Sequence, residues 1–428
     1  RAASDVYKRQ GTARAVPLWL ASNFRREIQS PKDEGFVNPV YGKDRRDAMY
    51  YAVAAGAGPT QQVLGRGIDG NDTPLVRKAL SALDQTAGGT TLWTGTGDRK
   101  PLLEALRYPS RRVQYEAALA LGGAGPRQAF DGSDQVVRIL GSAIRDASAK
   151  YAVVVTSDAE RNASISDVLR NQGYSVLPPA RSLADAQQGI SEAPGIDLIV
   201  SQLPSAQTAE LIEQAHTTVK LKATPILALV STQGYAEQAA RYIRDPRVRM
   251  LREGAAGAEV GEASKQLVEQ ATGGAITMEE AEGYKERSLS VLRDLAVSGN
   301  TVLNVADAGG PLVTALSEAK DQNKVRISEV LAHVNSRIAQ QAVTDAALAA
   351  KGEEMVVLLQ SAAGSAKRFG NMLEARHITA IKEVATTGAP AEATAAAALM
   401  GSLNLPNAEI VPLILGAAGG AEAERALR

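Results

Sequence analysis

The sequence predicts helical repeats of the α-solenoid type on both sides of an α/β domain with a parallel sheet. Between 150 and 273, short β-branched apolar runs alternate with segments of helical period. This pattern is typical of strands buried on both faces and of the helices that connect them. Outside this stretch, short helices and brief turns recur in units of roughly 30 to 45 residues, as in solenoids. We therefore expect helical repeats at 11–149, the α/β domain at 150–273 and helical repeats at 274–428.

The composition argues against several classes of partner and site. Lys plus Arg equals Asp plus Glu at 47 each, and aromatic residues make up 4%, so we expect no nucleic acid and no membrane partner. A local charged patch is still compatible with these totals. The absence of cysteine excludes disulfides, thiolate catalysis and zinc thiolate sites. No run approaches the roughly 20 apolar residues of a membrane span.

The first ten residues, RAASDVYKRQ, resemble a translated adapter scar at the edge of an assembled sequence. We exclude 1–10 from the fold and expect this segment to be a scar or disordered. The sequence does not begin with Met, which leaves open a preceding segment such as a signal peptide. With that reservation, we expect a cytoplasmic protein.

Seven helices are expected before the α/β domain. Thr60 is suited to cap one of them, Pro74 stands in the first turn of the next, and Gly88 and Gly89 follow the end of that helix. The expected helices lie at 11–29, 45–55, 60–68, 73–83, 101–106, 111–121 and 134–147.

Two residue patterns are interpreted as structural. Gly65, Gly67 and Gly70 form a lone GxGxxG, but a helix rather than a strand precedes it, so we expect turn glycines and no dinucleotide site. The histidines stand on separate expected helices with no second ligand four residues away, so packing or surface roles are favoured over metal binding. These histidines are His216, His333 and His377.

Four strands of the α/β domain follow from the apolar runs alone. Each run is too short for a helix, and the first, Ala152 to Val155, is mostly valine. The helical period that includes Ile165 and Leu169 stops at Gly173, where a glycine can adopt the left-handed conformation that ends a helix. The expected strands lie at 152–155, 175–177, 198–200 and 226–230.

Helices resume after Gly273. The last two predicted helices look like a repeat pair, because a glycine and a following proline, Gly401 and Pro406, close an alanine-rich stretch. The expected helices lie at 279–298, 310–319, 325–339, 344–350, 354–362, 371–386 and 390–403.

The flanking regions resemble HEAT and armadillo-like repeats. The segment YPSRRVQYEAALALGGAGP at 108–126 resembles the second helix of a HEAT repeat, in which alanines let neighbouring helices approach. VRKALSAL at 76–83 is a looser copy, and EATAAAALMGSLNLP at 392–406 repeats the alanines and the terminal glycine and proline. The resemblance implies that the helical surface binds other proteins. An irregular helical bundle is the alternative.

The α/β domain resembles a response-regulator receiver, a flavodoxin-like (βα)5 domain with a five-stranded parallel sheet. The resemblance covers the domain and rests on AVVVTSDAERN at 152–162, GYSV at 173–176, IDLIVSQLPS at 196–205 and TPILALVS at 224–231. It implies a fifth strand at VRML, 248–251. A generic five-stranded α/β domain without receiver ancestry is the alternative.

The resemblance implies that the phosphorylation site is degenerate. The position of the nucleophilic aspartate falls on Gln202, whose neutral amide cannot form an acyl phosphate. The acidic pair that holds Mg²⁺ falls on Thr156 and Ser157, or on Ser157 and Asp158 with a shift of one residue, which leaves at most one carboxylate.

The remaining receiver positions have also changed. The hydroxyl that senses the phosphoryl group would be Val230 or Ser231, and the lysine position lies near Arg252. Asp158 or Asp197 as a substitute phosphoacceptor is disfavoured, since Asp197 stands at the start of its strand, far from the carboxyl ends where such sites form.

We therefore predict a bacterial, non-enzymatic protein-protein interaction scaffold with a phosphorylation-incompetent pseudo-receiver domain. No cofactor and no metal are expected, and the receiver-like domain is a candidate homodimer contact. The alternative is a signalling switch in which that domain still responds to a ligand or phosphate. An ordinary enzyme is the third class, and it would need a pocket where acids converge with histidine.

Overall fold

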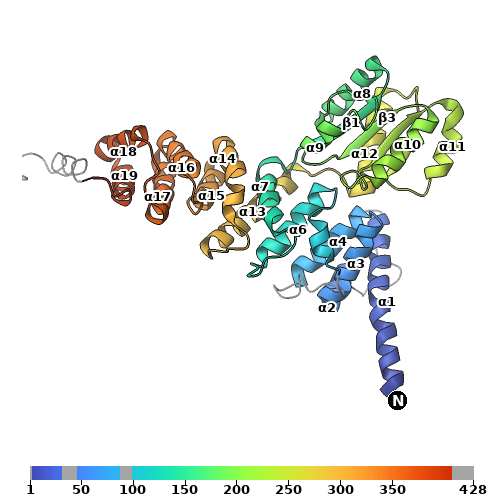
Figure 1. The fold of residues 1–428 in the computed structure, drawn as a ribbon, viewed down its shortest axis with the longest axis horizontal. Helices are drawn as coiled ribbons and strands as arrows, with labels where there is room; N and C mark the ends of the chain where they lie inside the picture. The colour runs from blue at the N-terminus through green and yellow to red at the C-terminus, as the bar shows by residue number, and fades with distance from the viewer. Residues whose placement is uncertain (1, 31–45, 87–98, 407–428) are drawn as a thin grey trace, which may run out of the picture. The chain divides into compact units, whose positions relative to one another are not determined.

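The computed structural model describes residues 2–30, 46–86 and 99–406, and these ranges contain 19 α-helices and one five-stranded sheet (Figure 1). The chain divides into two compact units. Unit 1 comprises Arg1–Ala124 and Asp146–Ala281, and unit 2 comprises Gly125–Arg145 and Glu282–Arg428. Each unit is therefore assembled from two separate stretches of the chain.

The sheet of unit 1 is entirely parallel. Its strands are β1 (Lys150–Thr156), β2 (Tyr174–Val176), β3 (Leu198–Gln202), β4 (Ile226–Val230) and β5 (Val248–Arg252). Their order across the sheet is β2-β1-β3-β4-β5. The connection from β1 to β2 therefore runs to one side of β1, and β3, β4 and β5 are added on the other side, so the strand order reverses between β1 and β3. The expected strands are confirmed: β4 has the expected bounds, β2 is shifted by one residue toward the N-terminus, and β1, β3 and β5 are longer than expected by one or two residues at one or both ends.

Five helices cover the two faces of this sheet. In chain order they are α8 (Ala159–Asn171), α9 (Gln187–Glu192), α10 (Ser205–Thr217), α11 (Thr232–Tyr242) and α12 (Gly257–Thr272). On one face, Val153 and Val155 pack with residues of α9 and α10, and Tyr235 and Ala239 of α11 lie against this cluster. On the other face, Val154 packs with residues of α8 and α12. The domain is therefore a three-layer sandwich whose strands are buried on both sides, as their valine-rich sequences predict.

Seven helices of the described ranges precede this domain in the chain, and the first six lie in unit 1. These six are α1 (Ala2–Gln29), α2 (Ala48–Ala55), α3 (Ala57–Asp69), α4 (Thr73–Thr86), α5 (Pro101–Ala105) and α6 (Arg111–Gly123). Helices α1, α2, α3 and α4 each pack on the second helix further along the chain, and α3 also packs on α4. Helix α1 begins at Ala2, so it includes most of the ten residues excluded from the fold above. Gly88 and Gly89 lie outside the described residues.

Two expectations about α3 are wrong. Thr60 does not begin the helix but lies inside it, and its hydroxyl donates to the carbonyl oxygen of Gly56 at 2.9 Å. Gly65 and Gly67 are also helical rather than turn residues. A Cβ atom at Gly67 would lie 2.8 Å from Cγ2 of Val76, so this glycine is needed because α3 and α4 approach so closely.

Unit 2 is helical throughout its described part, with α7 (Ser133–Asp146), α13 (Met278–Val297), the 3₁₀ helix η1 (Val305–Ala308), α14 (Gly309–Glu318), α15 (Asp321–Leu331), α16 (Arg337–Ala349), α17 (Gly352–Phe369), α18 (Ala375–Thr387) and α19 (Pro390–Ser402). Helices α7 and α13 each extend slightly across the unit boundary. The expected single helix at 325–339 is wrong, because α15 ends at Leu331 and a turn separates it from α16.

Packing in unit 2 follows a regular order. Each of the helices α14, α15, α16 and α17 contacts the second helix after it, and neighbouring pairs such as α16 with α17 also pack together. Residues far apart in sequence complete the unit, since a Cβ atom at Gly141 in α7 would contact Ala308 and Pro311 at 3.3 Å. None of the helices in the described ranges combines the length and the apolar character needed to cross a lipid bilayer.

Candidate functional site

The carboxyl edge of the parallel sheet is the place where α/β domains of this kind bind ligands, at the point where the strand order reverses. Here that point lies between β1 and β3. Thr156 and Gln202 end these two strands and are register partners, so two of the predicted site residues stand side by side. The side chains around them determine what this edge can do.

The loop after β1 is held by local hydrogen bonds. The backbone N–H of Asp158 donates to the buried hydroxyl of Thr156 at 3.2 Å. The carboxylate of Asp158 accepts from the backbone N–H of Arg161 at 3.1 Å and so caps the N-terminus of α8. Ser157 is exposed. The single carboxylate in this loop is therefore engaged as a helix cap.

Arg161, one turn into α8, is the functional residue that the sequence analysis missed. Its Nε donates to Oε1 of Gln202 at 2.9 Å. Its Nη2 donates to the carbonyl oxygens of Glu253 at 3.0 Å and Ala255 at 2.8 Å, in the loop after β5. One half-buried guanidinium thus connects α8, the end of β3 and the loop that precedes α12.

The other predicted residues do not join this cluster. Val230 is fully buried, and it belongs to the apolar cluster on the face covered by α9 and α10. The hydroxyl of Ser231 accepts from the backbone N–H of Gly234 at 3.3 Å and caps α11. The guanidinium of Arg252 is exposed and lies 5.3 Å from the ring centre of Tyr235. The positive charge beside Gln202 therefore comes from Arg161 and not from Arg252.

The chemistry available at this edge follows from its donor set. Gln202 contributes an amide oxygen, which is a far weaker nucleophile than a carboxylate. A divalent cation at this position would lie close to the guanidinium of Arg161 and would find only Asp158 as a carboxylate ligand, whereas hard cations are bound mainly through carboxylate oxygens. In the described part of the chain, no group of three histidine, aspartate or glutamate side chains is arranged to hold a metal ion.

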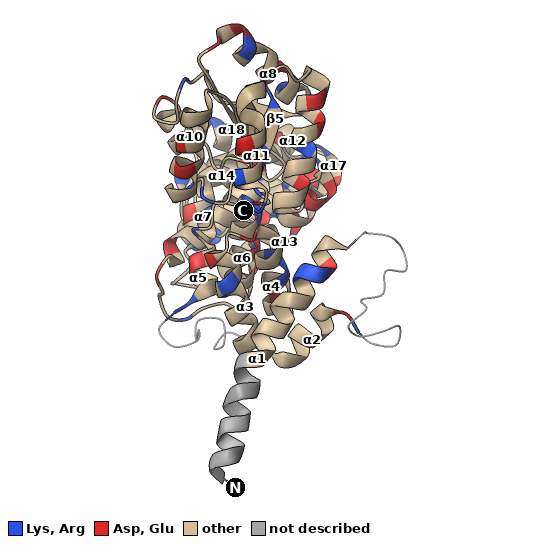
Figure 2. Ribbon diagram, turned by 90° about the vertical axis from the view of Figure 1, so that its right-hand side faces the viewer, with Lys and Arg blue, Asp and Glu red and all other residues tan. Residues whose placement is uncertain are grey.

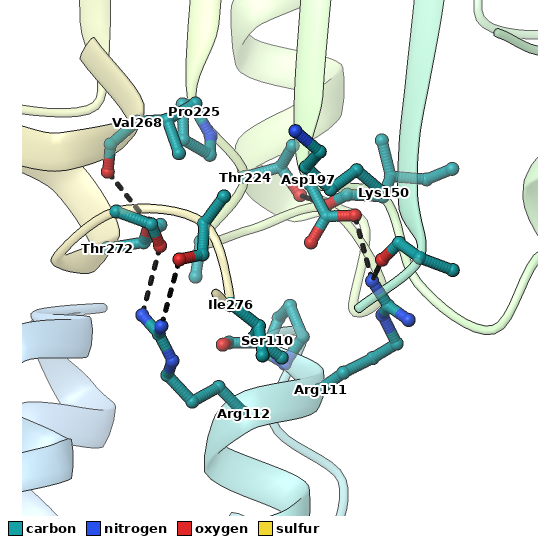
Figure 3. A pocket seen from close by; sticks show the side chains of 16 residues that line it. Ser110, Arg111, Arg112, Lys150, Asp197, Thr224, Pro225, Val268, Thr272 and Ile276 are labelled. Carbon is teal, nitrogen blue, oxygen red and sulfur yellow. Dashed lines mark hydrogen bonds and ion pairs between the residues drawn. The ribbon is translucent and has the colours of Figure 1, made fainter. Parts of the chain in front are cut away.

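The amino edge of the same sheet is closed by a second set of arginine contacts (Figure 3). Arg111, the first residue of α6, is 4% exposed. It donates to Oδ2 of Asp197 at 3.1 Å and to the carbonyl oxygens of Asp146 and Ala149. Burial by itself would lower the pKa of Arg111, but the charge of Asp197 and its hydrogen bond, together with two nearby tyrosine side chains, outweigh burial and the pKa is raised.

Arg112 makes the matching contacts to the segment that leaves the α/β domain. Its guanidinium donates to the carbonyl oxygens of Gly274 at 2.9 Å and Ala275 at 3.1 Å and to the carboxylate of Glu280. The cavity between the two arginines measures about 40 Å³, which has room for a few water molecules at most. This edge is therefore a structural junction.

Asp197 belongs to that junction, and this explains its position before β3. Its carboxylate accepts from the backbone N–H of Tyr151 at 2.8 Å as well as from Arg111. A Cβ atom at Gly195 would lie 2.9 Å from Cγ of Arg111, so the glycine makes room for the arginine. Asp197 therefore lies at the opposite end of β3 from Gln202, and it has a structural role.

Comparison of the chain with protein-family models, with curated proteins and with solved structures found no match.

Proposed function

We propose that the protein is a non-enzymatic scaffold that binds other proteins and carries a pseudo-receiver domain that does not undergo aspartyl phosphorylation. The observation that carries this proposal is the hydrogen bond between Arg161 and Gln202 at the carboxyl edge of the sheet. The strand order β2-β1-β3-β4-β5 supports the receiver resemblance, because it is the order of flavodoxin-like domains. Gln202 ends the third strand, where a receiver places its nucleophile.

The contacts of Arg161 explain why the domain is expected to keep one conformation. A receiver switches when a phosphoryl group draws the loops at this edge into a new arrangement. In this chain, the guanidinium already joins the end of β3 to the loop after β5 through three hydrogen bonds. Hydrogen bonds from a charged donor contribute about 1.5 to 3 kcal/mol each when buried. The bonds to Gln202 and Ala255 are partly buried and the bond to Glu253 is exposed, so each contributes less than this, but together they favour a fixed loop arrangement.

The helical arms would supply the binding surface. The packing of α14, α15, α16 and α17 on the second helix further along supports an arrangement of stacked pairs, as in HEAT and armadillo-like solenoids. The same order of contacts occurs for α1 to α4 in unit 1. Solenoid surfaces recognise proteins by extended contact rather than by an enclosed pocket.

Phosphate incorporation tests the proposal. The full chain is incubated with Mg²⁺ and acetyl phosphate, and its intact mass is measured beside that of a phosphorylatable receiver, which shows that the reagent is active. We expect no added phosphoryl mass. A phosphoryl group that survives substitution of surface hydroxyls but is lost in Asp158→Asn would contradict the pseudo-receiver assignment.

A further inference from the structure

Two adjoining grooves on unit 1 share no residue with the cavity between Arg111 and Arg112. The first is lined by the C-terminal end of α1, the turn between α3 and α4, the turn before β5 and the end of α12, and its volume is about 650 Å³. The second runs along α1 and α3 and measures about 680 Å³. Both are lined by Arg25 and Gln29, so they form one continuous surface that we call the α1 groove.

The carboxylates that line the α1 groove are already paired. Asp72 accepts from Arg25 at 2.7 Å, Asp245 from Arg247 at 2.7 Å and Asp69 from Arg99 at 2.9 Å. Hydrogen bonds from Arg99 lower the pKa of Asp69. Burial by itself would raise the pKa of Asp245, but the hydrogen bonds from Arg247 outweigh burial and the pKa is lowered. Each of these acids therefore has its charge balanced by a neighbouring arginine.

Four further arginines of the groove have no carboxylate within ion-pair distance among the described residues. All four are exposed, and the only ring contact among them is between Arg241 and Tyr242, at 5.5 Å. They come from α1, α3 and the α11 to β5 segment, so helices and α/β domain both contribute. These arginines are Arg26, Arg66, Arg241 and Arg244. Figure 2, in which lysine and arginine are blue and aspartate and glutamate red, shows basic residues at the C-terminal end of α1.

A buried acceptor in the same groove indicates what kind of anion would fit. Oδ1 of Asn71 is buried and has no hydrogen-bond partner within the described ranges, and Asn71 lines the groove beside Asp72. A buried polar atom without a partner is rare in folded proteins. This oxygen has almost no accessible surface, so a ligand donor would reach it only after a small movement of the Asn71 side chain. A peptide backbone has N–H donors for such a contact, whereas a phosphodiester backbone has none.

We propose that the α1 groove binds an acidic peptide segment of a partner protein, an inference that rests on the proposed scaffold function and names its partner's chemistry. The unpaired arginines would meet the glutamate or aspartate side chains of the peptide, since guanidinium and carboxylate form paired hydrogen bonds. Gln29 and Gln270 at the rim can bond its backbone. Single-stranded nucleic acid is the less suitable occupant, because it needs exposed aromatic rings for stacking and the ring of Tyr242 already contacts Arg241.

Fluorescence anisotropy of the full chain tests this proposal, with a labelled peptide of ten glutamates as the probe and a labelled oligothymidylate as the competing polyanion. Two variants of equal charge change are compared. The first is Arg241→Glu with Arg244→Glu in the groove. The second is Arg170→Glu with Arg181→Glu, two exposed positions near β2. Strands β2 and β5 are the two outermost strands of the sheet, on opposite sides.

We expect the glutamate peptide to bind with an affinity that falls as salt rises, and to bind about tenfold or more weakly to the groove variant only. Circular dichroism checks that both variants are folded. Absence of peptide binding to the wild-type chain, an equal loss in both variants, or tighter binding of the oligothymidylate would each overturn the proposal. None of these outcomes bears on phosphate incorporation, so the pseudo-receiver assignment stands or falls separately.

Discussion

The two edges of the parallel sheet are both closed by an arginine, but the two arginines differ in burial and in partners. At the amino edge, Arg111 is 4% exposed and bonds a carboxylate, Asp197, together with two carbonyl oxygens. At the carboxyl edge, Arg161 is half-buried and bonds the amide of Gln202 and two carbonyl oxygens. The first arginine joins α6 to the sheet, and the second joins loops at the edge where ligands usually bind.

This difference shows two ways in which an arginine can close an edge of a parallel sheet. A carboxylate at position 202 could bind a cation or a phosphoryl group, whereas the amide accepts a hydrogen bond from Arg161 without adding charge. At the amino edge the charge of the buried guanidinium must be balanced, because an unpaired buried charge is strongly destabilising. The amino edge should therefore matter more for stability than the carboxyl edge.

The largest effect is expected from Arg111→Ala. The substitution leaves Asp197 without its cation and two carbonyl oxygens without a donor, so the free energy of unfolding should fall by about 3 kcal/mol. Denaturant unfolding followed by tryptophan fluorescence measures this effect in unit 1, because Trp19 lies in α1 of that unit and the two stretches of unit 2 contain no tryptophan.

Two further variants make this measurement specific. Arg111→Lys keeps the charge but loses the forked geometry, so its loss should be intermediate. Arg170→Ala removes an exposed ion pair with Asp167 in the same unit and should change the unfolding free energy by less than about 1 kcal/mol. If Arg111→Ala were as stable as Arg170→Ala, the amino edge would not be the junction described above.

A smaller effect on the free energy of unfolding is expected at alkaline pH. It comes from Tyr174, the first residue of β2, at the amino edge of the sheet. Burial raises the pKa of Tyr174, and the charge of Asp197 adds to this. In the unfolded chain the phenol ionises near pH 10. The protonated phenol of Tyr174 therefore contributes its full stabilisation of the folded state below that pH. This stabilisation is lost as pH rises from about 10 toward the pKa of Tyr174 in the folded state.

Comparing the wild-type chain with Tyr174→Phe isolates this contribution. Between pH 9 and pH 11 the unfolding free energy of the wild type should fall faster with pH, by at most about 1.4 kcal/mol per pH unit. Tyr108 has a pKa raised by burial in the same way, and it is present in both chains, so its effect cancels. Parallel pH dependences would mean that Tyr174 ionises freely in the folded state.

Much of the α/β domain could be predicted from sequence because strands buried on both faces have short valine- and isoleucine-rich runs. The helical regions were harder to divide, since a turn between two helices can lack both glycine and proline. The turn between α15 and α16 is formed by Ala332 to Ser336, which has neither residue, so two helices were merged into one. Gly67 led to the opposite error. It was predicted to be a turn residue, but it lies inside α3, where a glycine is needed for close packing against α4.

The candidate site was predicted only in part. Gln202 and Thr156 could be placed because they end recognisable strands, but Val230 points into the core instead. Arg161 was missed because its partners are backbone carbonyl oxygens some 90 residues away along the chain, and such contacts leave no local pattern. The one available signal is its place three residues after the helix cap Asp158, which directs a long side chain toward the ends of the strands.

The most direct test is hydrogen–deuterium exchange at the carboxyl edge, measured with and without Mg²⁺ and fluoroberyllate. Fluoroberyllate mimics a phosphoryl group on an aspartate. The change in exchange rate expected here is the smallest of all the predicted effects. Arg161→Ala serves as the reference for sensitivity, because losing its bonds to Glu253 and Ala255 should speed exchange in that loop. We expect identical wild-type exchange over 156–162, 202–205 and 252–255 in both conditions. Slower exchange of these segments with fluoroberyllate would contradict the pseudo-receiver assignment.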